Sequence, residues 1–147
     1  MFAIKEIETE QTYPIRLKVL KTNDKYQHKY QGDFNKDTKH FGIFNKDILI
    51  GIVTVMPNEH SKLPNNAIQL RGMAVLPEYQ KKGIGKILIK EIEKRYSNKS
   101  VIWCNARDYA IGFYKALGFS IIGKKFYIKN VCDHFVMYKH IKKTDGI

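Results

Sequence analysis

Acidic side chains, cysteines and long apolar runs are all scarce in this sequence. The two cysteines, Cys104 and Cys132, exclude a disulfide framework, and the five histidines lack metal-ligand spacing with them, so we expect no metal. Cys104 lies in an apolar run and is expected to be a buried small hydrophobe. No apolar run reaches the roughly 18 residues of a membrane-spanning helix. The first ten residues lack a secretory-signal pattern, so we expect a soluble, cytoplasmic protein with no membrane partner.

The deficit of acids leaves a formal net charge of +12, from 26 lysines and arginines against 14 acids. Residues 71–100 hold eight basic and three acidic side chains, and residues 121–143 hold six and one. A basic surface attracts phosphorylated cofactors, nucleic acid or anionic membranes, and charge alone does not rank these partners. It is equally compatible with a solvated lysine-rich surface that has no partner.

The length of 147 residues fits one domain, residues 1–147, with an apolar fraction of 44%. The hydrophobic patterns predict the element order β-α-β-β-β-α-β-α-β-β, a mixed α/β class. The first helix is expected to start at Pro14, and a polar loop to cover residues 21–39. The predicted strands are 2–8, 40–44, 48–56, 68–76, 101–105, 120–129 and 133–140. The later helices are 84–96 and one that Asp108 caps and Gly118 ends.

The most informative stretch is the turn Gln80-Lys81-Lys82-Gly83-Ile84-Gly85, which joins a strand to an amphipathic helix. Glycines lack Cβ atoms, so backbone N–H groups can converge on one ligand, and a helix N-terminus adds unpaired donors and a positive dipole end. The predicted apolar stripe of this helix consists of Ile84, Ile87, Leu88 and Ile92. The turn therefore predicts a phosphate site, although paired glycines also occur in ordinary tight connections.

A second block narrows this interpretation. Asn105-Ala106-Arg107 is followed by Phe113-Tyr114 and by Leu117-Gly118-Phe119. Together the two blocks resemble the GCN5-related N-acetyltransferase (GNAT) superfamily: the turn matches its pyrophosphate signature R/Q-x-x-G-x-G/A, and the second block is similar to its FY-x-x-x-GF helix after the fifth strand. The resemblance covers roughly residues 40 to 140. It implies a mostly antiparallel central sheet that splays between the fourth and fifth strands.

The resemblance also implies a reaction, acetyl transfer from acetyl-CoA to an amine by direct attack on the thioester. In the superfamily the glycine turn binds the pyrophosphate, and the free backbone of the splayed strand pairs with pantetheine and the acetyl oxygen. The implied cofactor-binding residues are Met73, Ala74, Val75, Gln80, Lys81, Lys82, Gly83, Ile84, Gly85, Lys86, Asn105 and Tyr114. For Asn105, a plain strand-end cap of Arg107 or Asp108 remains an alternative.

Tyr114 is the implied general acid toward the CoA thiolate. A thiol has a pKa near 8.5 and a phenol one near 10, so the phenol stays protonated and can donate to a nascent thiolate. Without the resemblance, its helical spacing with Ala110 and Leu117 would assign Tyr114 to the core.

The general base is open among His134, Glu59, His60, Asp33 and a chain of waters. Histidine has the best matched intrinsic pKa. His134 resembles the histidine of a GNAT subgroup with a G-x-x-H pattern, but Val131 stands where that subgroup has glycine. A structural strand-end histidine is the alternative.

Three functions compete for this sequence. The favoured one is an acetyltransferase whose acceptor is a small-molecule or peptide amine, or an amine attached to RNA. The second is a GNAT-like domain that binds CoA without catalysis. The third, a basic nucleic-acid-binding module, lacks a helix-turn-helix or RNP signature. The acceptor, the length of the acyl group and the choice between monomer and homodimer stay open.

Overall fold

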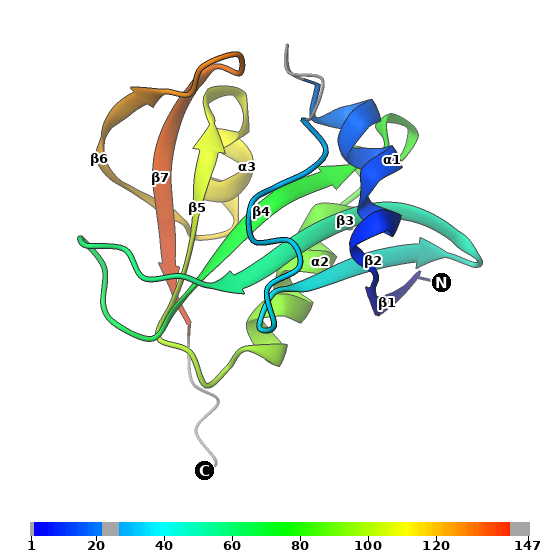
Figure 1. The fold of residues 1–147 in the computed structure, drawn as a ribbon, viewed down its shortest axis with the longest axis horizontal. Coiled ribbons are helices and arrows are strands. Elements are labelled where there is room, and N and C mark those ends of the chain that lie inside the picture. The colour runs from blue at the N-terminus through cyan, green and yellow to red at the C-terminus, as the bar shows by residue number, and fades with distance from the viewer. Residues whose placement is uncertain (1, 22–26, 142–147) are drawn as a thin grey trace.

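Seven strands form a single sheet in this computed structural model, which describes residues 2–21 and 27–141 (Figure 1). The strands are β1 Phe2–Ile7, β2 Lys39–Asn45, β3 Ile48–Pro57, β4 Ala67–Val75, β5 Val101–Arg107, β6 Ser120–Tyr127 and β7 Asp133–His140. The helices are α1 Thr9–Val19, α2 Ile84–Arg95 and α3 Ile111–Ala116, with 3₁₀ turns η1 Pro77–Tyr79 and η2 Asp108–Ala110. Their order agrees with the predicted one.

The strand order is β1-β2-β3-β4-β5-β7-β6, and β4 with β5 is the parallel pair in an otherwise antiparallel sheet. That pair is short. It runs from Ala67 opposite Val101 to Leu70 opposite Cys104, although both strands continue beyond it. Figure 1 shows β4 and β5 diverging past this point, which confirms the predicted splay.

A bulge in β4 accompanies the splay. The register between β3 and β4 shifts between Ile52 and Thr54, and Gly72 takes a left-handed φ of 61° on the β4 side. Bulges bend a strand and increase its twist. The bend therefore falls immediately after Leu70, the last β4 residue that pairs with β5.

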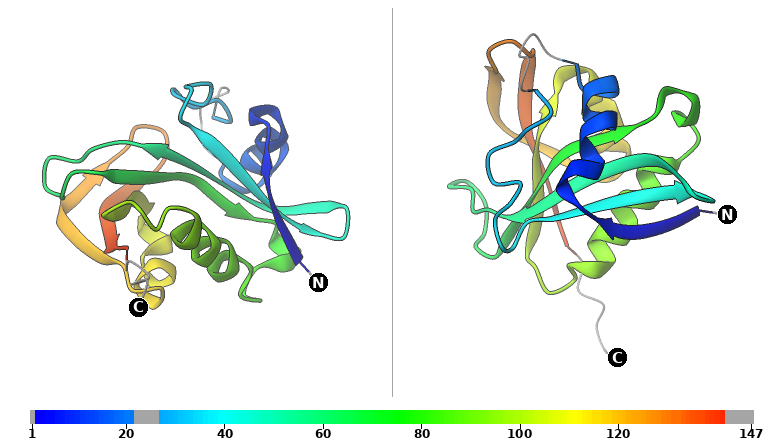
Figure 2. Two further views of the ribbon diagram at one scale, coloured as in Figure 1. Left: turned by 90° about the horizontal axis from the view of Figure 1, so that it is seen from below. Right: turned by 45° about the vertical axis from the view of Figure 1, so that its right-hand side comes forward.

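Helices cover both faces of the sheet (Figure 2): α2 and α3 lie on one side, and α1 with the segment before β2 lies on the other. The main core lies under α2, where Ile84, Leu88, Ile89 and Ile92 are at most 1% exposed. The predicted stripe was wrong at one position, because Ile87 is 41% exposed and Ile89 takes its place. Both sets satisfy a 3.6-residue period, so the direction of the sheet, which the sequence does not give, decides between them.

The start of α1 corrects another prediction. The helix begins at Thr9 rather than Pro14, because Glu8 and Gln11 form a capping box that satisfies the first backbone donors. Pro14 lies inside the helix. The buried face of α1 contains Thr9, Thr12, Ile15 and Arg16.

The third helix was predicted correctly at its end and wrongly at its start. Gly118 has φ 93°, and the Phe119 N–H donates to the Tyr114 carbonyl at 3.0 Å, the pattern of a glycine-terminated helix. Asp108 opens η2 instead of capping α3, and neither element has a side-chain cap. Of the predicted polar loop 21–39, residues 22–26 lie outside the described residues. Within the described ranges, no helix is long and apolar enough to cross a membrane.

Candidate active site

A cavity of about 440 Å³ opens where β4 and β5 separate. Its walls are residues 69–73 of β4, residues 104–107 of β5, the segment before β2, the β6–β7 connection, η2 and Tyr114 of α3. This volume is typical of small-molecule sites, which span roughly 300–1,000 Å³. Four of the predicted site residues line it, namely Met73, Asn105, Tyr114 and His134.

The glycine turn lies next to this cavity but outside its lining. A Cβ atom on Gly85 would approach the Phe113 ring to 2.8 Å and the Met73 Cε to 3.2 Å. Glycine at this position therefore lets the start of α2 pack against β4 and α3, directly beside Tyr114. Ala74 was also predicted to bind the cofactor. Its side chain is buried in the core on the α1 face of the sheet, so only its backbone groups can contact a ligand between β4 and β5.

The turn has the backbone geometry of an anion site. Lys81 and Gly83 take left-handed φ angles of 61° and 80°, and α2 starts at Ile84 with no side-chain cap. The first N–H groups of a helix have no partner within the helix, and they carry the positive end of its dipole. Lys81, Lys82 and Lys86 are exposed around them. A phosphate can therefore bind here through backbone donors and three mobile cations.

Gln80 fixes the turn to the end of β4. Its side-chain Nε2 donates to the Val75 carbonyl at 2.9 Å. A primary amide carries two protons. Gln80 thus has one donor left for a ligand, and its other donor holds the turn against the strand that borders the splay.

Tyr114 is buried, with 6% exposure, and its ring makes edge contacts with Phe113 and Phe119. Its hydroxyl lies near the Cys104 thiol, and the two groups influence each other's pKa. Burial raises the pKa of Tyr114 well above that of a free phenol, and Cys104 raises it further. Burial likewise raises the pKa of the Cys104 thiol to about 12. Tyr114 is therefore a neutral phenol at the cavity wall.

His134 lies across the cavity on β7, opposite Arg107 of β5 in the register. Its Nδ1 lies 2.8 Å from the Cys132 carbonyl, which can only accept, so Nδ1 carries a proton and Nε2 keeps the lone pair of the neutral ring. Burial lowers the pKa of His134 and Arg107 lowers it further, whereas the Cys132 carbonyl, Asp108 and Asp133 act to raise it. The net result is a ring that stays neutral at pH 7.

The turn before His134 does not need the glycine of the related subgroup. Asn130 takes the left-handed φ of 65° immediately before Val131, and the Val131 N–H donates to the Ile128 carbonyl at 3.0 Å. Asparagine tolerates this conformation well. Because Asn130 takes the left-handed conformation, the turn can form with valine at position 131, where the related subgroup has glycine.

The other base candidates lie outside the cavity lining. Glu59 accepts a hydrogen bond from the Asn66 N–H, and His60 accepts one from the Lys62 N–H. Asp33 is paired with Arg16. Residues 57–66 contribute no cavity residue, whereas Lys29 and Tyr30 of the predicted loop 21–39 do.

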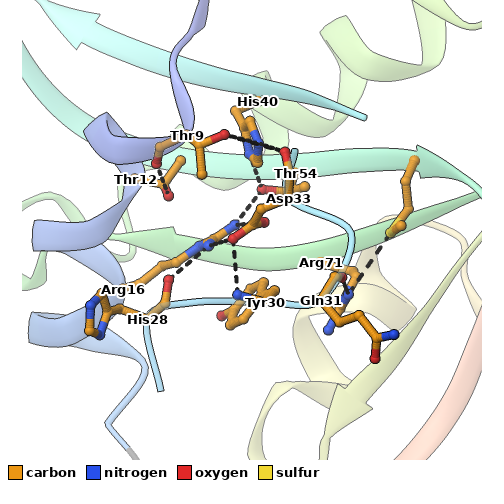
Figure 3. A network of polar contacts seen from close by, with 11 residues as sticks. Thr9, Thr12, Arg16, His28, Tyr30, Gln31, Asp33, His40, Thr54 and Arg71 are labelled. Carbon is orange, nitrogen blue, oxygen red and sulfur yellow. Dashed lines mark hydrogen bonds and ion pairs between the residues drawn. The ribbon is translucent and has the colours of Figure 1, made fainter. Parts of the chain in front are cut away.

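A buried polar network, drawn in Figure 3, holds the segment before β2 in place. The fully buried guanidinium of Arg16 donates to both Asp33 carboxylate oxygens at 2.8 and 3.0 Å and to the Thr54 hydroxyl at 2.8 Å. Asp33 also accepts the Tyr30 N–H at 2.9 Å, and His40 lies 2.7 Å from the Thr54 hydroxyl through Nδ1. The network fixes Tyr30 against the cavity.

The sequence did not predict that Tyr30, held by the Arg16–Asp33 network, forms a wall of the cavity, which we call the acceptor wall. The one available signal was Arg16 itself, a charge on the helix face that also contains Thr12 and Ile15, because a buried arginine requires a buried acid. For metals, the described parts of the chain contain no group of three or more His, Cys, Asp or Glu side chains that could hold an ion.

Comparison with known proteins agrees with this geometry. The model of the acetyltransferase (GNAT) family matches residues 2–119. An uncharacterized N-acetyltransferase, YitI of Bacillus subtilis, is 35% identical, with 98% of this chain and 99% of the relative covered.

Solved structures share the fold at lower identity. The ribosomal-protein-S18-alanine N-acetyltransferase of Escherichia coli superposes with a TM-score of 0.76 at 18% identity, covering 100% of this chain and 99% of that one. An aminoglycoside 6'-N-acetyltransferase complexed with coenzyme A gives 0.73 at 16% identity, covering 95% and 97%. The family match and the identity to the curated relative show that this chain belongs to the GNAT family and is an N-acetyltransferase.

Proposed function

We propose that this enzyme moves an acetyl group from acetyl-CoA to the amine of a small-molecule or peptide acceptor by direct attack on the thioester. One observation carries the proposal: the glycine turn at the start of α2 adjoins the gap between β4 and β5, which Asn105 and Tyr114 line. The aminoglycoside acetyltransferase of the same fold is complexed with coenzyme A, which supports the choice of cofactor. We also propose a cytoplasmic location, consistent with the two free cysteines.

The cofactor has a binding surface at each of its parts. The pyrophosphate is assigned to the N–H groups of residues 82–86 and to donors of Gln80, Lys81 and Lys82. The pantetheine arm is assigned to those backbone groups of Met73, Ala74 and Val75 that face away from β3, on one side of the splay, and to Asn105 on the other. Because β4 and β5 do not pair beyond Leu70, their facing peptide groups are available to the amides of this arm.

The chemical step needs two proton transfers. The amine nitrogen attacks the thioester carbon, a C–N bond forms, and the C–S bond breaks. His134 Nε2 accepts the proton that the nitrogen loses, and the Tyr114 hydroxyl supplies a proton to the departing thiolate. Exchange with solvent then restores both groups, and the products are the N-acetylated amine and CoA with a free thiol.

Calorimetry with acetyl-CoA and thiol release with a panel of amines test the proposal. We expect saturable acetyl-CoA binding, weakened in Gly83→Ala, and amine-dependent thiol release. Gly123→Ala is the matched control, since Gly123 also has a left-handed φ, of 83°, but lies on β6. Binding without release on any amine would instead favour a CoA-binding domain without catalysis, and absent binding would overturn the proposal.

A further inference from the structure

Among the described residues, every charged side chain that lines the cavity is a cation. These are Lys29, Arg71, Arg107 and Lys129, and no aspartate or glutamate is among the lining residues that the structure describes. They come from four separate parts of the chain: the segment before β2, β4, β5 and the β6–β7 connection. The positive character is thus a property of the cavity rather than of one lysine-rich run.

The cofactor phosphates do not account for these cations. The proposed phosphate site has its own lysines, Lys81, Lys82 and Lys86, and none of them lines the cavity. Two of the cavity cations lie beside the other polar lining residues instead: Arg71 lies beside Tyr30, and Arg107 lies opposite His134 in the register of β5 and β7.

Arg71 is the best defined of the four. It follows Leu70, where pairing between β4 and β5 stops, and its guanidinium donates to the Gln31 carbonyl at 2.7 Å (Figure 3). It lies 4.9 Å from the centre of the Tyr30 ring. Burial lowers the pKa of Arg71, and it forms no ion pair with an acidic side chain in the described ranges. Its charge is therefore held in place, and the Asp33 carboxylate acts on it without a direct ion pair.

Tyr30 lies among three guanidinium groups, those of Arg16, Arg71 and Arg107. Its ring lies 3.8 Å from the Arg16 guanidinium carbon, and the left-handed Gly72 admits it, since a Cβ there would be 2.8 Å from the ring. Burial raises the pKa of Tyr30, while Arg16, Arg107 and Arg71 all act to lower it, so three guanidinium groups act on one phenol. The nearby acid, Asp33, is occupied by both arms of Arg16.

We infer that the acceptor is an anionic amine, whose carboxylate or phosphate is bound by Arg71 and Arg107 while its amine lies between His134 and Tyr114. The inference rests on the proposed acetyltransferase function and narrows its substrate. The planar guanidinium fork matches carboxylate and phosphate oxygens. Polyamines and other polycations are disfavoured, because like charges in a confined site repel one another.

The same cations assist the chemistry. A nearby positive charge lowers the pKa of an acceptor ammonium group, because it disfavours the charged form. A larger share of the bound acceptor is then the neutral amine that attacks the thioester. Recognition of the anion and activation of the nucleophile thus use the same residues.

The test compares four amines of equal chain length, carrying a terminal carboxylate, a phosphate, a methyl group or a second amine, with acetyl-CoA as donor. We expect kcat/KM to be at least tenfold higher for an anionic amine than for the methyl compound, and lowest for the diamine. The carboxylate and phosphate arms identify which anion is preferred. A neutral amine or the diamine as the best acceptor overturns the inference while leaving the acetyltransferase intact; failure of acetyl-CoA to bind overturns the proposed function itself.

Substitutions of the two arginines test whether they bind the carboxylate or phosphate of the acceptor. Arg71→Gln and Arg107→Gln should each raise KM for the anionic amine about tenfold or more, with little change in KM for acetyl-CoA and a smaller effect on the methyl compound. Arg95→Gln is the control, because Arg95 lies on α2 and pairs with Glu91 outside the cavity. Equal losses for the anionic and methyl compounds would contradict the inference. If one variant does not fold, the other and the wild-type panel still decide it.

Discussion

The proposed phosphate site and the proposed acceptor site are built in opposite ways. The proposed phosphate site uses contiguous residues, Gln80 to Lys86, and mostly their backbone groups. The proposed acceptor site uses side chains from distant parts of the chain, such as Tyr30, Arg107 and His134, and the buried Arg16–Asp33 ion pair supports the Tyr30 side of the cavity. A local motif can specify a cofactor site that many enzymes share. A site assembled from many elements can change its specificity one side chain at a time.

The largest effect is expected from Asp33→Asn, which breaks the buried support of the acceptor wall. Removing one partner of a buried ion pair leaves the Arg16 charge uncompensated and costs about 3–5 kcal/mol of the free energy of unfolding. Urea denaturation measures the loss. The control is Glu91→Gln, whose exposed pair with Arg95 should contribute only about 0.5 kcal/mol. Equal losses in the two variants would show that the network does not support the wall.

The same pair predicts a pH dependence. Burial alone would raise the pKa of Asp33, but hydrogen bonds from Arg16 and from the Tyr30 N–H bring it below the ordinary value. A lowered folded-state pKa gives stability that is present above the unfolded value and is lost as the pH falls through the folded one. The free energy of unfolding of the wild type should therefore decrease below about pH 4 more than that of Asp33→Asn.

Tyr114→Phe tests the proposed proton transfer from the Tyr114 hydroxyl to the departing thiolate. Loss of the proton donor should lower kcat about 100-fold, with a small change in KM for acetyl-CoA, in steady-state kinetics. Tyr96→Phe is the matched control, because the Tyr96 hydroxyl is buried at the end of α2 without a partner in the structure described. An unchanged kcat in Tyr114→Phe would return Tyr114 to a purely structural role.

His134→Gln tests the proposed acceptor site alone. Because burial lowers the pKa of His134, the neutral ring should persist below the ordinary histidine pKa, and wild-type kcat should decline only at pH values below about 6.5. The variant should lose this acidic limb and show at least tenfold lower kcat at pH 7. A variant that keeps the limb would assign it to another group. Binding of acetyl-CoA should not change.

Gly83→Ala is expected to have the smallest effect on stability. A Cβ there meets nothing within 4 Å, so the cost comes from the left-handed backbone alone, about 1–2 kcal/mol. Gly123→Ala should cost a similar amount. Thermal denaturation measures the backbone strain, which both variants should share. Calorimetry measures the affinity for acetyl-CoA, which only Gly83→Ala should lower.

The element order, the splay and the glycine turn could be predicted because each is encoded by neighbouring residues or by a motif that carries the fold with it. The start of α1 was missed because the capping box of Glu8 and Gln11 outweighs the preference of Pro14 for a first turn. The acceptor wall was missed for a different reason. Arg16 contacts Asp33 and Thr54, which lie 17 and 38 residues away, and no local pattern reports such contacts.

The divergence of β4 from β5 also gives the protein two strand edges in the middle of its sheet. Exposed edges invite pairing with other chains, but these edges face a cavity of about 440 Å³ rather than open solvent. A cofactor arm that carries amides would complete the sheet as an additional strand. Occupancy should then slow hydrogen exchange in β4 beyond Leu70, and stabilise the fold by about 2.7 kcal/mol when the ligand is at 100 times its Kd.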